Sequence, residues 1–168
     1  TIEGDGVIDG RGPEFWNPPS GEGWAGRWYR NKSERISPLI EIRNCRNVVL
    51  RDFVIRNSPG WTLHVNCCDQ VVIRGVVVDN DLFGPNTDGF DINGCRDVFV
   101  SDCNLRCGDD AIILKATDDA RSCERITVTN CILQSNCAAL GLGAETTHGI
   151  RDVAFSNCVV RSALRIIQ

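Results

Sequence analysis

The chain has 168 residues, of which 42% are hydrophobic, and it carries a formal net charge of −4. This length and apolar content predict one domain with a substantial core, and the even mixture of acidic and basic residues excludes the basic stripe that nucleic acid binding requires. No apolar run approaches the roughly 20 residues that cross a bilayer, so we expect neither a nucleic acid nor a membrane as partner.

The chain begins inside an expected strand and turn. Its first residues, TIEGDGVIDGRG, alternate apolar and polar side chains around glycines, and the sequence contains no Met. It ends on LRIIQ, an apolar strand pattern that no turn or cap follows. We therefore expect residues 1–168 to be a single segment of a longer domain whose C-terminal part is missing.

A long segment without an alternating pattern follows at residues 11–38. It is rich in Gly, Pro and aromatic residues, the large ones being Trp16, Trp24, Trp28 and Tyr29. Large aromatic side chains are usually at least partly buried. We expect most of these rings to pack a long loop onto the rest of the domain.

Five similar blocks fill the chain from residue 45 to residue 162. Their fourth positions are Val48, Val71, Val98, Ile126 and Val153, so successive blocks lie 23, 27, 28 and 27 residues apart. Each block alternates apolar and polar residues, then has a polar turn and a second short alternating segment. Repeats of this length without a helical period are typical of an all-β parallel β-helix, a solenoid whose coils stack about 4.8 Å apart.

A β-sandwich of antiparallel hairpins is the alternative fold. It would require two-residue Asn-Gly or Asp-Gly turns between strands. The one near candidate, Asp88-Gly89, lies inside the repeat pattern. The sequence therefore favours the parallel β-helix.

Most of the ten cysteines occupy two repeat positions. The first holds Cys45, Cys68, Cys95 and Cys123, and the second holds Cys103, Cys131 and Cys158. Buried thiols are favoured because free Cys behaves as a small hydrophobe, although disulfides between stacked neighbours are also compatible with the spacing. The Cys pairs lack the spacing and nearby His of a zinc site, so we expect no metal.

Three carboxylates share one place in the repeat. When the short segments are aligned on their second inward residue, the residues four positions earlier are Trp61, Asp88, Asp110, Ala138 and Ser162. Asp88 and Asp110 then lie on neighbouring coils, with Asp109 beside them. Like charges this close raise the pKa of at least one acid, and a protonated acid beside ionised partners suits acid–base hydrolysis. Each motif alone would be an ordinary Asn/Asp/Gly turn, but both in one register favour a catalytic site.

One further column is expected to face outward on the same sheet. It contains Glu41, His64, Asp91, Ile113, Gly141 and Arg165. His64 and Asp91 are candidates for binding a ligand there, although a surface His or Asp needs no function. Lys115 and Glu145 fit solvated turn residues.

At these motifs the sequence resembles glycoside hydrolase family 28, the polygalacturonases and related pectin hydrolases. The matching stretches are GVIDGRG (6–12), NSPGWTLHV (57–65), NTDGFDI (86–92), GDDAIILK (108–115) and LRI (164–166). They follow the family's order along nearly the whole chain. The NTDG and GDD motifs together, at this spacing, are a specific signal of this resemblance, whereas the IDG motif alone is a weak one.

The resemblance implies a right-handed parallel β-helix that cleaves pectic polysaccharides with inversion and without a metal or other cofactor. It implies that Asp109 is the general acid, that Asp88 and Asp110 activate water, and that Arg165 binds a sugar carboxylate. Such an arginine suits a carboxylate because guanidinium bonds it through two parallel donors. The resemblance also implies a secreted protein. The aromatic rings of the long loop would then be candidates for stacking on sugars.

Two positions depart from the family's pattern. Ala138 stands where the family has the His of a Gly-His-Gly motif, and Ile167 replaces the Lys of its Arg-Ile-Lys motif. These departures indicate a divergent member that acts on a mixed pectin such as a rhamnogalacturonan, or that cleaves from a chain end. Two alternatives stay open: a β-helix polysaccharide lyase, in which the acids would hold Ca²⁺ and Arg165 would abstract a proton, and a non-catalytic carbohydrate-binding β-helix. The oligomeric state is left open.

Overall fold

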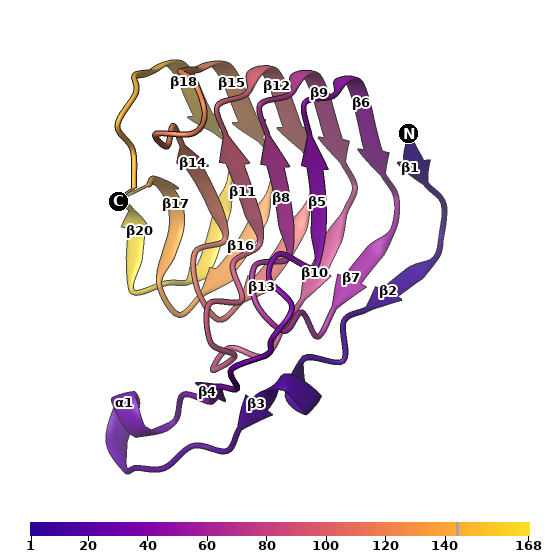
Figure 1. The fold of residues 1–168 in the computed structure, drawn as a ribbon. Coiled ribbons are helices and arrows are strands. Elements are labelled where there is room, and N and C mark those ends of the chain that lie inside the picture. The colour runs from indigo at the N-terminus through magenta and orange to yellow at the C-terminus, as the bar shows by residue number, and fades with distance from the viewer. Residues whose placement is uncertain (144) are drawn as a thin grey trace.

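A computed structural model describes residues 1–143 and 145–168. The chain winds into three six-stranded parallel sheets that form the faces of one solenoid, as Figure 1 shows. This confirms the predicted all-β parallel β-helix. Among the described residues, no helix is long and apolar enough to span a bilayer.

Each coil contributes one strand to each sheet, and neighbouring strands in a sheet come from neighbouring coils. The first sheet contains β1 (Ile2–Glu3), β6 (Arg46–Arg51), β9 (Asp69–Arg74), β12 (Arg96–Ser101), β15 (Cys123–Thr129) and β18 (Ile150–Ser156). The second contains β2 (Val7–Asp9), β7 (Val54–Arg56), β10 (Val77–Asp79), β13 (Asn104–Cys107), β16 (Ile132–Ser135) and β19 (Val159–Ser162). The third contains β5 (Ile40–Arg43), β8 (Leu63–Asn66), β11 (Phe90–Asn93), β14 (Ile112–Lys115), β17 (Ala138–Leu142) and β20 (Arg165–Ile167).

The long N-terminal segment leaves the solenoid and folds back beside it (Figure 1). It contains a 3₁₀ turn (Gly12–Phe15), β3 (Trp16–Asn17), α1 (Gly23–Gly26) and β4 (Arg30–Asn31), with β3 and β4 paired antiparallel. Trp16 anchors it, because this side chain is only 4% exposed and its indole Nε1 donates to the carbonyl oxygen of Pro59 at 2.9 Å. The expectation that the aromatic rings pack this loop is correct for Trp16.

The sequence alternation matches the strands. In β9, Val71 and Ile73 are buried, whereas Val72 between them faces solvent. The corner after the first sheet is marked on every full coil by a residue with positive φ: Asp52, Gly75, Asp102, Asn130 and Asn157. Gly, Asn and Asp adopt this left-handed conformation at the least cost, so the polar turn of each repeat fixes the corner.

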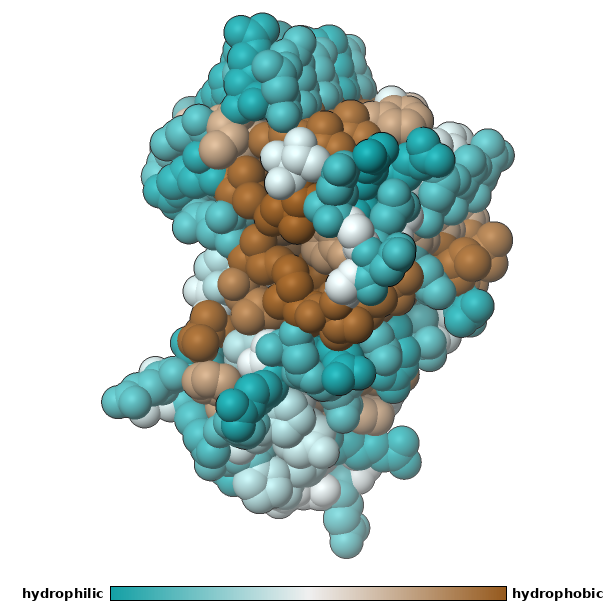
Figure 2. All heavy atoms as spheres, turned by 90° about the vertical axis from the view of Figure 1, so that its right-hand side faces the viewer, coloured by the Kyte–Doolittle hydropathy of each residue, from teal (hydrophilic) through white to brown (hydrophobic). Residues whose placement is uncertain are grey.

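Stacked columns of apolar side chains, including the small Cys columns, fill the interior. The predicted cysteine columns are present, since Cys68 and Cys95 occupy one position on successive coils and Cys103 and Cys131 another. All ten thiols are free. Seen from the side that β1 and β6 form in Figure 1, hydrophobic residues gather in the middle of the face and hydrophilic residues surround them (Figure 2).

The register of the last coil differs from the expected one. Arg165 pairs with Ala138 and Ile167 pairs with Leu140, so Arg165 does not stand beside Gly141. Gln168 takes that place. The expected register was wrong because this segment carries apolar residues at successive positions as well as alternate ones, and such a pattern fits more than one register.

Candidate active site

The three predicted carboxylates do gather at one place on the third sheet. Asp88 precedes β11 and Asp110 precedes β14, and these two strands pair with Phe90 opposite Ile112. The backbone N–H of Gly89 donates to the carbonyl oxygen of Asp110 at 2.8 Å, which continues this ladder up to the two acids. Asp109 lies one residue before Asp110. Parallel pairing therefore stacks Asp88 on Asp110.

Glycines flank these acids because the backbone is crowded there. A Cβ added to Gly89 would lie 2.3 Å from the carbonyl oxygen of Ala111. A Cβ added to Gly108 would lie 2.4 Å from the carbonyl oxygen of Gly84. Neither gap admits a side chain, so the glycines of both motifs allow neighbouring segments to approach closely.

Asp88 is the most buried member of the cluster. It is 4% exposed, and its Oδ1 has no hydrogen-bond partner within the protein. Burial raises the pKa of Asp88 well above its ordinary range, and the nearby charges of Asp91 and Asp109 raise it further. Asp88 therefore has a strong tendency to hold a proton and an oxygen that is free to bind a ligand.

Asp109 is held by two donors. Its Oδ1 accepts from the backbone N–H of Asp110 at 3.0 Å, and its Oδ2 accepts from Nδ2 of Asn86 at 3.3 Å. Burial and the neighbouring charge of Asp110 raise the pKa of Asp109. Asp110 in turn accepts at Oδ1 from the backbone N–H of Ala138 at 2.9 Å. Each of these two acids thus has a fixed orientation.

Cys137 adjoins both of these acids. Its Sγ and one carboxylate oxygen each of Asp109 and Asp110 lie within 4.8 Å of one another. Within residues 1–143 and 145–168, this is the one group of three such side chains close enough to share a metal ion. Burial, followed by Asp110, raises the pKa of the Cys137 thiol to about 12.

Arg35 also reaches the site, and nothing in its sequence surroundings indicated this. Its Nη1 donates to the carbonyl oxygen of Pro85 at 2.8 Å, and its Nη2 donates to Oδ1 of Asn86 at 3.2 Å. Because the amide oxygen of Asn86 is engaged by Arg35, the amide nitrogen points at Asp109. The long loop thus contributes a group that orients a neighbour of the predicted acid.

Two hollows meet at Asp109. The smaller, of about 190 Å³, is lined by Trp61, Asn86, Asp88, Asp109, Asp110, Ile113, Lys115, Gly143, Glu145 and Gln168. The larger, of about 450 Å³, is lined by Trp24, Trp28, Tyr29, Pro85, Asn86, Asp109, Asn136, Cys137, Leu164 and Arg165. Only Asn86 and Asp109 line both. Asp109 is therefore the carboxylate at the junction, whereas Asp88 and Asp110 face the smaller hollow alone.

Lys115 is not the solvated turn residue that the sequence indicated. It ends β14, is 6% exposed, and its Nζ lies 3.9 Å from the centre of the Trp61 ring. The same Nζ lies 3.2 Å from Oδ1 of Asp91 and 2.9 Å from Oε2 of Glu145. Although burial alone would lower the pKa of Lys115, the two carboxylates together raise it. Lys115 therefore stays charged at the floor of the smaller hollow.

Asp91 and His64 are less accessible than an outward-facing position suggests. Asp91 is fully buried beneath Lys115, and burial raises its pKa to about 7 against the opposing charge of that lysine. Asp91 lines neither hollow. His64 is 7% exposed and packs edge-on against Trp61, with Nδ1 3.4 Å from Glu41 and Nε2 without a partner. Burial lowers the pKa of His64. Neighbouring side chains cover Asp91 completely and leave His64 a small exposed edge, which lines a separate hollow shared with Trp61 and Lys115.

Arg165 lies on the larger hollow. Its Nη1 donates to Oε1 of Gln168 at 2.9 Å and lies 3.8 Å from Sγ of Cys137. Three rings of the N-terminal segment line the same hollow, and among them Trp24 is 50% exposed. This hollow therefore combines an arginine with accessible aromatic surface.

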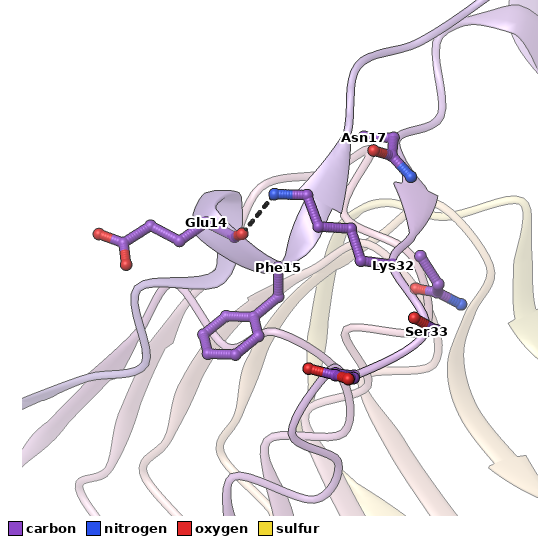
Figure 3. A pocket seen from close by; sticks show the side chains of 7 residues that line it. Glu14, Phe15, Asn17, Lys32 and Ser33 are labelled. Carbon is purple, nitrogen blue, oxygen red and sulfur yellow. Dashed lines mark hydrogen bonds between the residues drawn. The ribbon is translucent and has the colours of Figure 1, made fainter.

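A further hollow, of about 510 Å³, lies outside the carboxylate site. It sits within the N-terminal segment and is lined by Glu14, Phe15, Asn17, Asn31, Lys32, Ser33 and Glu34. Lys32 closes one side of it by donating from Nζ to the carbonyl oxygen of Glu14 at 2.6 Å (Figure 3). It shares no residue with the carboxylate site and has no cluster of acids, so its size alone does not make it the candidate site.

Comparison with known proteins gives one consistent family. The model of glycosyl hydrolases family 28 matches residues 1–166. A probable polygalacturonase of Vitis vinifera is 28% identical over 98% of this chain and 34% of its own length. A polygalacturonase of Juniperus ashei is 32% identical over 67% of this chain and 22% of its own length. The chain thus spans about a third or less of these relatives.

A solved structure agrees with this family. The hyperthermoactive exopolygalacturonase from Thermotoga maritima matches with a TM-score of 0.65 and 29% sequence identity, over 71% of this chain and 28% of its own. The similarity therefore extends from the sequence to the coil geometry.

Proposed function

The chain belongs to glycosyl hydrolase family 28, and from this premise we propose that it hydrolyses glycosidic bonds of a pectic polysaccharide with inversion. In this proposal Asp109 protonates the leaving oxygen, and Asp88 and Asp110 activate the attacking water. The observation that carries it is the position of Asp109, which of the three acids alone lines both hollows. A glycosidic oxygen between a sugar in each hollow would lie beside this carboxylate.

The environment of Asp109 suits an acid. A general acid must hold its proton near the working pH, and burial together with Asp110 raises the pKa of Asp109 in that direction. The raised pKa thus supports its assignment as the proton donor.

Asp88 and Asp110 suit the water-activating role. Both line only the smaller hollow, and Oδ1 of Asp88 has no partner within the protein. A water held between them would attack the sugar in the smaller hollow from the side away from the leaving group, which gives inversion. Removal of its proton is assisted by whichever of the two acids is ionised.

The remaining candidates have separate roles. Arg165 would bind a carboxylate of the sugar in the larger hollow, where it can offer two donors to one acid group. Asp91 would act only by holding Lys115, and His64 only by supporting Trp61, because neither residue lines the two hollows that meet at Asp109. The loss of the family's His at Ala138 and Lys at Ile167 supports a mixed pectin such as a rhamnogalacturonan, or cleavage from a chain end. Because pectic polysaccharides lie outside cells, the enzyme would act as a secreted protein.

The test compares the protein with its Asp109→Asn variant on polygalacturonate, methyl-esterified pectin and rhamnogalacturonan. Release of reducing ends should fall by about 10² to 10⁴ in kcat, with the melting temperature kept. NMR of the first products should show the inverted anomer. Asp118→Asn, at an exposed position outside both hollows, is the matched control and should be fully active.

Three results would contradict the proposal. Turnover of Asp109→Asn near that of the unaltered protein would remove Asp109 from the mechanism. Binding of oligogalacturonides without any cleavage by the unaltered protein would favour a carbohydrate-binding β-helix instead. An unsaturated product absorbing in the ultraviolet would indicate a lyase.

A further inference from the structure

Cys137 differs from the cysteines of the two stacked columns in its position. It precedes β17 and belongs to neither stacked column of the core, and it is partly exposed on the wall of the larger hollow. Its Sγ faces the carboxylates of Asp109 and Asp110, all three donors lying within 4.8 Å of one another. Packing does not require a thiol here, so its contact with two acids is a separate chemical feature.

Asp88 provides a second, independent observation. Its side chain is almost completely buried, and its Oδ1 lacks any hydrogen-bond partner in the protein. Asp88 lines the smaller hollow together with Asp109 and Asp110. A buried carboxylate oxygen normally finds a donor or a cation, so an unpartnered one beside two further acids indicates a place for a positive ligand.

The donor set selects the kind of cation. One sulfur and two carboxylate oxygens match Zn²⁺, which binds Cys sulfur at about 2.3 Å and carboxylate oxygen at about 2.0–2.2 Å, usually with four ligands, one of which can be water. Ca²⁺ and Mg²⁺ prefer oxygen alone. Cd²⁺, which also binds thiolate, is a suitable probe. The side chains would have to close in from their present spacing, and Arg165, whose Nη1 is 3.8 Å from Sγ, would have to turn away.

We propose that Asp109, Asp110 and Cys137 form an inhibitory site for a thiophilic divalent cation such as Zn²⁺, with a water as the fourth ligand and the nearby Asp88 adding negative charge. Binding releases to solvent both the thiol proton and the proton that Asp109 holds, and it involves no change of oxidation state. The cation would occupy the oxygen of Asp109 that carries the proton in catalysis. The inhibitory effect rests on the proposed hydrolase function, whereas cation binding does not.

Binding is tested first, by titrating the reduced protein with Cd²⁺ and following the ultraviolet charge-transfer absorption of a cadmium–thiolate bond. The unaltered protein and a Cys45→Ala control, which lacks an exposed thiol elsewhere, should give the same saturable band. Cys137→Ala should lose that band or need at least about tenfold more Cd²⁺. A band that persists unchanged in Cys137→Ala would overturn the site.

Inhibition is tested next, on whichever pectic substrate the protein cleaves. Zn²⁺ should inhibit the unaltered protein and Cys45→Ala, whereas Cys137→Ala should need at least about tenfold more Zn²⁺ for the same inhibition. Ca²⁺ and Mg²⁺ at the same concentrations should not inhibit. Equal inhibition of all three proteins by Zn²⁺ would contradict the proposal. If no substrate is cleaved, the Cd²⁺ titration alone decides the site, so the two proposals fail separately.

Discussion

Asn86 donates from Nδ2 to Oδ2 of Asp109 across 3.3 Å, while its own amide oxygen accepts from Arg35 at 3.2 Å. The guanidinium thereby fixes which end of the amide faces the acid, since Arg is only a donor. A residue from the N-terminal segment thus determines part of the electrostatic environment of Asp109. This arrangement makes Arg35 a positioning residue.

Replacing Arg35 should therefore raise the pKa of Asp109. In Arg35→Gln the Asn86 amide is free to turn, and Asp109 loses a donor that lowers its pKa. The pKa of Asp109 should rise, so the alkaline limb of the kcat profile should shift to higher pH, because the general acid stays protonated longer. A lower maximal kcat without a shift of the alkaline limb would mean that Arg35 only supports the loop. Arg30→Gln, at an exposed position of the same segment, should leave the profile unchanged.

Stability should fall as pH rises between about 4 and about 7. Unfolded Asp has a pKa of about 3.9, whereas burial raises that of Asp91 to about 7. Below pH 4 Asp91 is protonated in both states, and its contribution to stability is fully present. Between the two values the unfolded chain ionises first, which favours unfolding. The pKa values of Asp88 and Asp109 are also raised, so these two acids contribute in the same direction.

Urea unfolding at about pH 5 and about pH 8 measures this effect, because these values bracket the raised pKa of Asp91. The midpoint should be lower at the higher pH, and Asp91→Asn should reduce the difference, whereas Asp118→Asn should not. A urea midpoint that rises with pH would contradict the raised pKa values of these acids.

Removing Lys115 should destabilise the fold more at high pH than at low pH. Lys115→Met leaves the fully buried Asp91 without its cation, and breaking a buried pair in this way costs about 3–5 kcal/mol. Below the pKa of Asp91 the acid can take up a proton, so the loss should be smaller there. The double variant Asp91→Asn, Lys115→Met should recover much of the loss in the same urea experiment. No recovery would show that Lys115 stabilises chiefly through Trp61.

Gly89→Ala should be destabilising, since its added Cβ would lie 2.3 Å from the carbonyl oxygen of Ala111. Overpacking of this kind costs about 1–3 kcal/mol, and the forced movement should also displace Asp88 and lower kcat. Gly6→Ala is the matched control, because a Cβ there meets nothing within 4 Å. Equal unfolding midpoints for the two variants would contradict the close approach at Gly89.

The repeat made much of this structure predictable. The positions of Val48, Val71 and Val98 gave the coil length, and the coil length placed Asp88 on Asp110 with Asp109 beside them. The alignment was wrong at Arg165, where apolar residues at successive positions fitted a second register. It was also incomplete for Lys115, whose burial depends on Trp61 from two coils earlier and on Glu145 from a following turn.

The sequence by itself determined the solenoid and the gathering of three acids, because both follow from a local period that recurs along the chain and in-register pairing repeats it in space. Only the tertiary structure decided which acid lies between two hollows, that Asp91 is covered, and that Arg35 reaches Asn86 from about fifty residues away. Those properties depend on how a non-repeating loop and long side chains fill the space beside the coils, and no periodic pattern carries that information.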